Sequence, residues 1–343
     1  TPFTSDGRLD VEGVRKLARF QLDSGVSGLV PCGTTGESPT LAWEEHDAIV
    51  MSVVEAAGSR ASVMAGTGSN STTEAIEATR AALRHGASAA LVVDCYYNGP
   101  SSLELRTEYY ERILEAVPEI PIVPYIIPGR SGCALSAADL AILHLSNPSR
   151  VPAVKQATGD LERMREDRAL AGQSLAILSG DDDLTVPLMA DEVIRASGVI
   201  SVISNFAPGA LVKLVAAQAS GDLTTVASLR EAIAPLLKLV TCIVPAERTL
   251  PDGRRVEVSD KYRNPVPVKT VMAGLGMIGP VNRAPLGRMS LEAVESCRAV
   301  LREVYTASPE ILSPIDDAFG VRVGDRLADD AIWAALARPR ERA

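Results

Sequence analysis

The chain of 343 residues is long enough to bury a large core, as one barrel-type domain or as two ordinary domains. Its 46% hydrophobic and 22% charged residues are typical of a soluble globular protein, and a net charge of −9 disfavours a nucleic-acid or anionic-membrane partner. No apolar run reaches the length of a membrane span, and no signal-peptide pattern begins at Thr1. Five cysteines without metal-ligand spacing predict a cytoplasmic, reducing environment and no metal site.

The first 205 residues alternate between helical and strand-like segments. In residues 10–24, for example, apolar side chains recur at Val11, Val14, Leu17 and Leu22, which is helical spacing. Short continuous apolar runs lie between the helical segments and indicate strands buried on both faces of a parallel sheet. The predicted strands are 28–32, 62–65, 89–94, 121–125, 151–155, 175–179 and 199–203, and the predicted helices are 10–24, 43–57, 73–85, 103–117, 136–145 and 161–170.

Seven strand-like runs separated by helices imply a parallel sheet with right-handed crossovers. An eighth strand would close a (β/α)8 barrel, and Thr1-Pro2-Phe3 is expected to be the remaining end of a first strand. The competing doubly wound sheet lacks the Gly-x-Gly-x-x-Gly that would follow its first strand. We therefore predict a (β/α)8 TIM barrel over residues 1–208 with a truncated first strand.

Beyond Asn205 one helical pattern follows another, over residues 210–219, 223–240, 268–275 and 291–305. These patterns predict a small C-terminal helical domain over residues 209–305. A charged stretch near residues 245–265 contains the turn signal Asp252-Gly253 and is interpreted as an inserted surface hairpin. For the tail over residues 306–343, a packed extra helix and a mobile segment both remain open.

Lys155 closes an apolar run, whereas most lysines keep their ammonium group in water. Burial lowers the pKa of a lysine and leaves a neutral amine that attacks carbonyl carbons. In isolation an edge-strand lysine or an ion-pair partner is the better explanation. Other polar and glycine residues, however, also end predicted strands, at the rim that carries the active site in (β/α)8 barrels. They are Thr34, Thr35, Tyr97, Tyr125, Gly180, Asp181, Asp182, Ser204 and Asn205.

Four segments carry a family resemblance: Gly33-Thr34-Thr35-Gly36-Glu37, Tyr96-Tyr97-Asn98, Tyr125-x-x-Pro128-x-Arg130-x-Gly132 and Lys155-x-x-x-Gly159-Asp160. They resemble the dihydrodipicolinate synthase family, pyruvate-dependent class I enzymes that also include N-acetylneuraminate lyase. The resemblance extends over roughly residues 1–307. It implies an enzyme that condenses pyruvate with L-aspartate 4-semialdehyde in lysine (diaminopimelate) biosynthesis, without a metal or organic cofactor.

The same resemblance implies a role for each matching residue. Lys155 would form the Schiff base with pyruvate, while Tyr125, Thr34 and Tyr97 relay protons. Tyr97 would enter the site of a neighbouring subunit, so a dimer is the smallest competent unit and a homotetramer the expected assembly. The substrate-binding residues implied are Thr35 for the pyruvate carboxylate, Arg130 for the aldehyde carboxylate, and Ile200 and Gly180 beside the lysine.

The sequence departs from the family pattern at the usual Tyr-Asn-x-Pro, which here is Tyr125-Ile126-Ile127-Pro128. The missing asparagine is a structural amide rather than a proton carrier, so catalysis is still expected. Arg130 favours the synthase over lyases that act on uncharged sugars. The alternatives are another pyruvate-dependent aldolase or lyase, either N-acetylneuraminate lyase-like or acting on keto-sugar acids, and a non-catalytic barrel paralogue.

A regulatory lysine site is a second implication of the resemblance. Glu74 would pair with the ligand ammonium group, and Trp43 would supply a flat wall, although some members carry histidine there. Asn70 and Glu74 are four residues apart on a predicted helical segment and are expected to project from one face. Packing of a helix onto the barrel explains Trp43 and His46 equally well. The matching positions are Ser38, Trp43, His46, Asn70, Glu74 and Tyr96.

Overall fold

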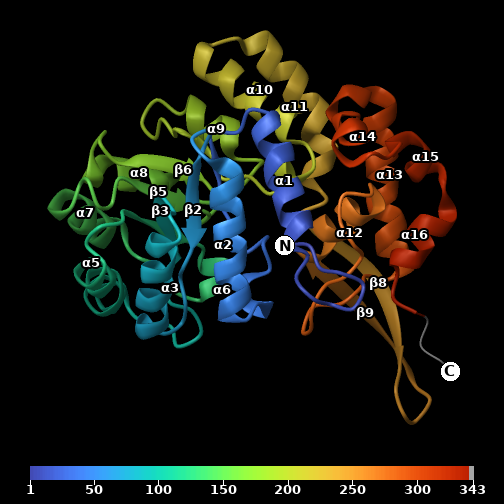
Figure 1. Ribbon diagram of the computed structural model, residues 1–343, viewed down its shortest axis with the longest axis horizontal. Coiled ribbons are helices and arrows are strands. Elements are labelled where there is room, and N and C mark those ends of the chain that lie inside the picture. Colours follow the sequence, from blue (N-terminus) through green and yellow to red (C-terminus); the bar gives the residue numbers. More distant parts are fainter. Residues whose placement is uncertain (340–343) are drawn as a thin grey trace.

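In the computed structural model, which describes residues 1–339, seven parallel strands form one sheet whose spatial order follows the sequence. Helices connect successive strands and lie on the outer face of the curled sheet (Figure 1). The strands are β1 (Gly28–Leu29), β2 (Ser62–Gly66), β3 (Ala89–Val93), β4 (Ile122–Ile126), β5 (Ala153–Gln156), β6 (Ala176–Ser179) and β7 (Gly198–Val199).

Side-chain caps begin several of the connecting helices, because a serine or aspartate oxygen satisfies an otherwise unpaired backbone amide. Ser71, Ser136 and Asp160 each accept from the amide three residues further on. The barrel helices are α1 (Val11–Asp23), η1 (Ser38–Thr40), α2 (Trp43–Ala57), α3 (Thr72–Arg84), α4 (Ser102–Glu104), η2 (Leu105–Tyr110), α5 (Glu111–Ala116), α6 (Pro128–Ser131), α7 (Ala137–Ser146), α8 (Leu161–Ala171), α9 (Thr185–Ala190) and η3 (Ile203–Asn205).

All seven predicted strands are present, but the two at the sheet edges are short. Within residues 1–339, β1 and β7 do not pair with each other, so each has a neighbour on one side only. Residues 1–3 do not join the parallel sheet as the predicted end of a first strand. Phe3 instead forms an antiparallel bridge with Leu9 and is fully buried.

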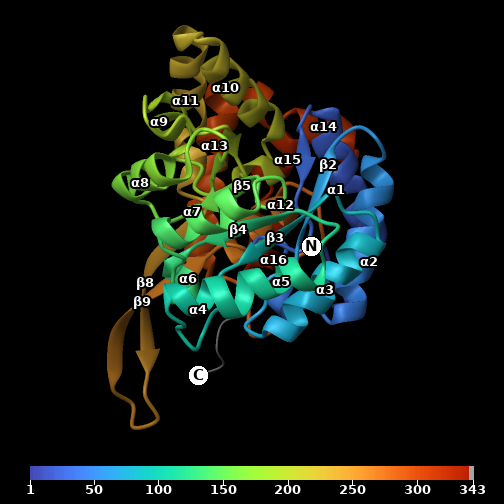
Figure 2. The ribbon, with the colours of Figure 1, turned by 90° about the vertical axis from the view of Figure 1, so that its left-hand side faces the viewer.

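The remainder of the described chain is mainly helical and packs beside the curled sheet (Figures 1 and 2). The charged insertion forms the β8–β9 hairpin, β8 (Thr241–Thr249) paired with β9 (Arg255–Arg263), which projects from the body of the molecule. The helices are α10 (Pro208–Ser220), α11 (Leu223–Leu237), α12 (Val266–Gly274), α13 (Leu291–Ala307), η4 (Pro309–Ile311), α14 (Pro314–Phe319), α15 (Val323–Ala328) and α16 (Asp330–Leu336).

The tail left open by the sequence is helical as far as Leu336, and its last four residues, 340–343, lie outside the described part. Trp333 of α16 is fully buried in the same apolar cluster as Leu301 of α13. Its indole nitrogen donates to the carbonyl of Arg326, which satisfies the polar end of the ring. The described tail is therefore part of the C-terminal core.

The register of the central strands determines which residues lie beside Lys155. In the β4–β5 pair Tyr125 is opposite Lys155, and in the β5–β6 pair Lys155 is opposite Leu178.

Residues 1–339 contain no helix with both the length and the apolar character that crossing a membrane requires.

Candidate active site

Lys155 lies near the carboxyl end of β5 with only 8% of its surface exposed. Its Nζ is 4.1 Å from the centroid of the Tyr125 ring, and in residues 1–339 it forms no ion pair. Burial lowers the pKa of Lys155 to about 8, although the carboxylates of Asp182 and Asp181 act in the opposite direction. The neutral, nucleophilic fraction of this amine near neutral pH is therefore much larger than that of a solvated lysine.

Tyr125 is buried beside the amine, at the end of β4. Burial raises the pKa of its phenol, while a hydrogen bond with Thr34 acts to lower it. The Tyr125 hydroxyl consequently stays protonated and can donate or pass on a proton. Thr34 comes from the loop after β1, so two different strand ends supply this pair.

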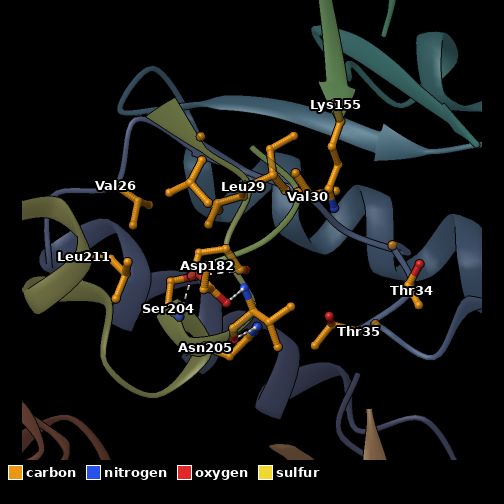
Figure 3. Close-up of a pocket in the computed structure, with 18 of the residues that line it drawn as sticks. Val26, Leu29, Val30, Thr34, Thr35, Lys155, Asp182, Ser204, Asn205 and Leu211 are labelled. Atoms are coloured by element: carbon orange, nitrogen blue, oxygen red, sulfur yellow. Dashed lines mark hydrogen bonds between the residues drawn. The ribbon is translucent and has the colours of Figure 1, made fainter. Parts of the chain in front are cut away.

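A cavity of about 1100 Å³ opens in front of Lys155, between the rim of the sheet and the C-terminal region (Figure 3). Gly180 lines the cavity, and a Cβ there would come within 2.7 Å of Ala157 Cβ, 3.0 Å of the Gln156 carbonyl oxygen and 3.2 Å of Lys155 Cε. A larger residue at position 180 would therefore crowd the end of β5, where Lys155 lies. Seven of the eight catalytic and substrate-binding residues predicted from the sequence line this cavity: Thr34, Thr35, Tyr125, Arg130, Lys155, Gly180 and Ile200.

Tyr97 is the exception, because it is not among the residues that line the cavity. Its side chain is 89% exposed, and its backbone has a positive φ of 81°, which is uncommon for a residue other than glycine. Within this chain the ring therefore projects into solvent rather than toward Lys155.

Asp182 contributes buried negative charge to the cavity. Its Oδ2 accepts hydrogen bonds from the amides of Val202 and Ile203, at 2.9 and 3.1 Å (Figure 3). Burial raises the pKa of Asp182, while these hydrogen bonds and the charge of Lys155 act to lower it. The contacts fix the segment after β7 against the loop after β6, next to Ile200.

The loop that carries Thr34 and Thr35 is held by the C-terminal region. Asn264 donates from Nδ2 to Thr35 Oγ1 at 2.8 Å, and its carbonyl accepts from Arg130 at 2.9 Å. Glu37, which has a left-handed backbone, is paired with Lys269 of α12 at 2.5 Å. Asn264 thus contacts both Thr35, which is predicted to bind the pyruvate carboxylate, and Arg130, which is predicted to bind the aldehyde carboxylate.

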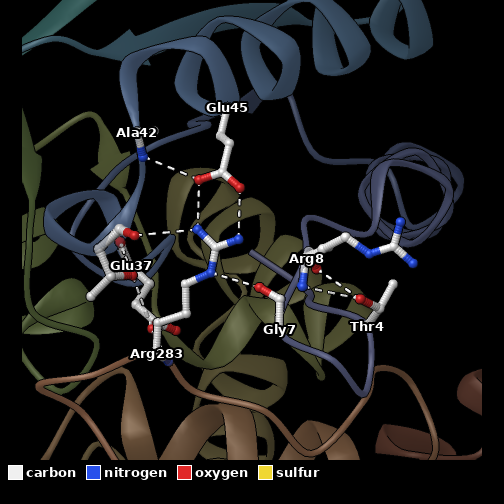
Figure 4. A network of polar contacts seen from close by, with 8 residues as sticks. Thr4, Gly7, Arg8, Glu37, Ala42, Glu45 and Arg283 are labelled. Atoms are coloured by element: carbon white, nitrogen blue, oxygen red, sulfur yellow. Dashed lines mark hydrogen bonds and ion pairs between the residues drawn. The ribbon is translucent and has the colours of Figure 1, made fainter.

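Arg283 completes this contact between the two parts of the chain (Figure 4). Its guanidinium forms two hydrogen bonds with Glu45, and its Nε donates to the carbonyl of Gly7. Its backbone amide donates to Glu37 at 2.8 Å. Arg283 therefore connects the region after α12 to the loop after β1 and to the start of α2, through hydrogen bonds and an ion pair.

The predicted regulatory residues lie on and around α2 and α3, with mixed exposure. Trp43, Asn70 and Glu74 are exposed, whereas His46 is buried and its Nε2 is 2.7 Å from the carbonyl oxygen of Gly66. The expectation that Asn70 and Glu74 share a helical face is wrong, because α3 begins at Thr72. Ser69 links them instead, with its Oγ 2.6 Å from Glu74 and 3.4 Å from Asn70.

Asn264, Lys269 and Arg283 were not singled out from the sequence. Asn264 follows a charged insertion and was included in a surface hairpin, although it is only 6% exposed. The signal that could have identified it is the run Asn264-Pro265-Val266-Pro267, an uncharged break between the charged stretch and an apolar helix.

Known proteins are similar to this chain over most of its length. The model of the dihydrodipicolinate synthetase family matches residues 1–250. A 4-hydroxy-tetrahydrodipicolinate synthase from Methanothrix thermoacetophila is 41% identical over 305 residues, which cover 89% of this chain and 94% of the relative.

Two solved structures are similar over almost their whole length. A dihydrodipicolinate synthase from Acinetobacter baumannii, complexed with pyruvate, has a TM-score of 0.77 and 34% identity, covering 89% of this chain and 96% of the other. The structure of DHDPS from Cyanidioschyzon merolae with lysine bound has a TM-score of 0.77 and 29% identity, covering 89% and 95%. The similarity therefore includes both the curled sheet and the C-terminal region.

Proposed function

This chain belongs to the dihydrodipicolinate synthetase family, and we propose that it condenses pyruvate with L-aspartate 4-semialdehyde through a Schiff base on Lys155. The reaction is that of 4-hydroxy-tetrahydrodipicolinate synthase, a lyase of lysine biosynthesis. The observation that carries the assignment of Lys155 is its buried amine, with a pKa of about 8, at the strand rim beside Tyr125.

The neutral Nζ of Lys155 attacks the ketone carbon of pyruvate and forms a carbinolamine. Loss of water from this adduct gives the imine, whose positive charge makes the pyruvate methyl group acidic. Removal of one methyl proton gives an enamine, which attacks the aldehyde carbon of aspartate semialdehyde. Cyclisation by the substrate amino group onto the imine carbon then releases Lys155. Tyr125 and Thr34 supply and accept the protons, because they are hydrogen-bonded beside the amine.

Substrate carboxylates bind on two sides of the cavity. Thr35 and the neighbouring amides of its loop hold the pyruvate carboxylate, and Asn264 fixes the Thr35 hydroxyl. Arg130 holds the aldehyde carboxylate in a bidentate pair. Ile200 and Gly180 border the lysine. Support for these roles comes from the lining of one cavity by all four residues together with Lys155.

The proton relay is completed by Tyr97 from a neighbouring subunit. Its exposure in the single chain supports this proposal, because an aromatic ring in solvent is available to enter a partner's site. We propose a homotetramer built from two such dimers, located in the cytoplasm, where the five free cysteines stay reduced. Tyr97→Phe is expected to lower kcat much more than pyruvate binding, and an unchanged kcat would remove Tyr97 from the relay.

Lysine is the proposed regulator, bound near Ser38, Trp43, His46, Asn70, Glu74 and Tyr96. The lysine-bound relative and the exposed carboxylate of Glu74 support this site, while the buried and hydrogen-bonded His46 contributes packing. Calorimetry with millimolar lysine is expected to show binding that reduces activity without simple competition with pyruvate. Coupling between lysine and substrate is expected to be about 1–3 kcal/mol. Absence of both heat and inhibition would leave these residues with a packing role.

Borohydride trapping with pyruvate tests the Schiff base, since a reduced imine adds mass to Lys155 and a non-catalytic paralogue gains none. The aldehyde is tested by turnover with aspartate semialdehyde in parallel with sialic acid and keto-sugar acids. Turnover restricted to aspartate semialdehyde is the expected result. Cleavage of the sugar acids instead would assign the chain to the lyase branch of the superfamily.

A further inference from the structure

The β8–β9 hairpin begins and ends in the wall of the active-site cavity. Thr241, its first residue, and Arg263, its last, are paired in register, and both line the cavity together with Val240 and Asn264. The hairpin is therefore continuous with the site, although most of its length projects away from the body (Figure 2).

Strand alternation decides which hairpin residues face the cavity. Successive side chains point to opposite faces of a strand. On one face, Cys242 is buried and the Tyr262 hydroxyl accepts from the amide of Ser290 at 3.1 Å, which fixes this face to the C-terminal core. Arg263 and Thr241 belong to the opposite face, on which Arg263 is exposed at the cavity mouth.

Most arginines of the hairpin have acidic partners. Arg248 pairs with Asp260 at 2.7 Å, Arg254 with Asp252 at 2.7 Å, and Arg255 with Glu247 at 3.4 Å. These pairs neutralise charge along the projecting ribbon and are too exposed to contribute much stability.

Arg263 differs from those arginines, because within residues 1–339 no carboxylate pairs with it or with Arg130. Both arginines nevertheless line one cavity, and the guanidinium of Arg130 donates to the carbonyl of Asn264, the residue that follows Arg263. Burial lowers the pKa of Arg130, and the charge of Arg263 lowers it further. Asp181 and Asp182 also line the cavity, but they act on Lys155, whereas the charge that acts on Arg130 beside Tyr125 is that of Arg263. Two neighbouring cations that form no ion pair repel each other and favour binding of an anion between them.

We propose that Arg263 is a second guanidinium for the carboxylate of the aldehyde substrate, acting with Arg130, so that the β8–β9 hairpin determines specificity for acidic aldehydes. This inference rests on the proposed function. It assigns to the insertion a task in substrate binding rather than in Schiff-base formation, since Arg263 lies at the mouth and Lys155 at the base of the site.

Steady-state kinetics of Arg263→Ala with aspartate semialdehyde, at saturating pyruvate, tests the proposal. Loss of one charge-assisted contact at a partly solvated site is expected to raise KM for the aldehyde roughly tenfold, with little change in kcat. Arg263→Lys keeps the positive charge but lacks the planar guanidinium group, so its KM for the aldehyde is expected to lie between those of the wild type and Arg263→Ala. Arg255→Ala is the matched control, since it removes the same charge from the same hairpin face away from the cavity.

Borohydride trapping of the pyruvate imine separates this proposal from the proposed function. Normal trapping together with a raised aldehyde KM in Arg263→Ala supports the carboxylate contact. A KM equal to that of the wild type or of Arg255→Ala would overturn it, as would equal losses in trapping and in aldehyde binding. Absence of trapping in the wild type would instead refute the proposed function.

Discussion

The carboxyl end of β5 and the first turns of α12 each bury one lysine, and the surroundings of these two lysines differ in one respect. Lys155 is 8% exposed and Lys269 is 4% exposed, and each Nζ lies over an aromatic ring, at 4.1 Å from Tyr125 and 4.2 Å from Phe3. Lys269 also has a carboxylate, Glu37, at 2.5 Å, whereas Lys155 has no ion-pair partner in residues 1–339. Burial lowers the pKa of both lysines, but only Lys269 has a directly bonded anion that opposes the effect.

The difference supports the proposal that Lys155 is the nucleophile and that Lys269 has a structural role. An unpaired buried amine is stabilised in its neutral form and can attack a carbonyl group. A buried lysine bonded to a carboxylate retains its charge and anchors the chain to which that carboxylate belongs. Here the carboxylate lies in the loop of Thr34 and Thr35, so Lys269 positions residues of the site without facing the cavity.

Replacement of the unpaired lysine is expected to have the largest effect. Lys155→Ala should abolish borohydride-dependent labelling by pyruvate and lower kcat at least a thousandfold, because no other group replaces the nucleophile. Mass spectrometry of the trapped protein measures the labelling. Lys238→Ala, at a site outside the cavity, is the control. Persistent labelling of Lys155→Ala at another lysine would show that the nucleophile has been misassigned.

Replacement of the paired lysine is expected to affect stability rather than chemistry. Lys269→Met leaves the carboxylate of Glu37 buried without its cation and should lower the free energy of unfolding by about 3–5 kcal/mol. Urea denaturation measures the change. Arg60→Ala breaks an exposed pair with Asp23 and is expected to cost less than about 1 kcal/mol.

The double variant with Lys269→Met and Glu37→Leu sharpens this comparison. It removes both charges and should be more stable than Lys269→Met alone, since no uncompensated charge remains buried. A single variant as stable as the wild type would mean that Glu37 finds another partner or becomes protonated.

The smallest expected effect is the pH dependence of imine formation. With a pKa of about 8, the neutral fraction of Lys155 should rise about tenfold between roughly pH 7 and pH 9, and the initial trapping rate should rise with it. Burial lowers the pKa to this value, with a smaller contribution from the charge of Arg130, while the carboxylates of Asp182 and Asp181 oppose the shift. A rate that continues to rise steeply toward pH 10.5 would indicate an ordinary solvated lysine.

The same pKa shift has a consequence for stability. Between about pH 8 and pH 10.5 an unfolded Lys155 binds more protons than the folded one, because its pKa is the higher of the two. The contribution of Lys155 to folding therefore becomes more favourable as pH rises through this window.

Periodicity and a few motifs were sufficient to predict the fold class and the family, and both predictions are confirmed by the helix-covered parallel sheet and by the relatives. Strands buried on both faces leave continuous apolar runs, and helices leave a 3.6-residue pattern, so each can be recognised locally. Lys155 was recognisable for the same reason, as a charged residue that ends an apolar run.

Local patterns were less informative where the chain is irregular. Asn70 was placed on a helical face with Glu74, but Ser71 caps α3 and leaves Asn70 outside the helix. The charged insertion was recognised as a hairpin from its turn signal, yet no local pattern indicates that Arg263 lines the cavity. Packing of Cys242 and Tyr262 against the C-terminal core decides that orientation.

By itself the sequence determined the order of strands and helices, the family and the lysine that we propose as the nucleophile. Only the tertiary structure decided which distant residues complete the site. Asn264 meets Thr35 across 229 residues, and Lys269 meets Glu37 across 232. Contacts between residues so far apart leave no periodic signal in either segment. They form because folding places the helical region against the strand ends, where buried polar groups must find partners.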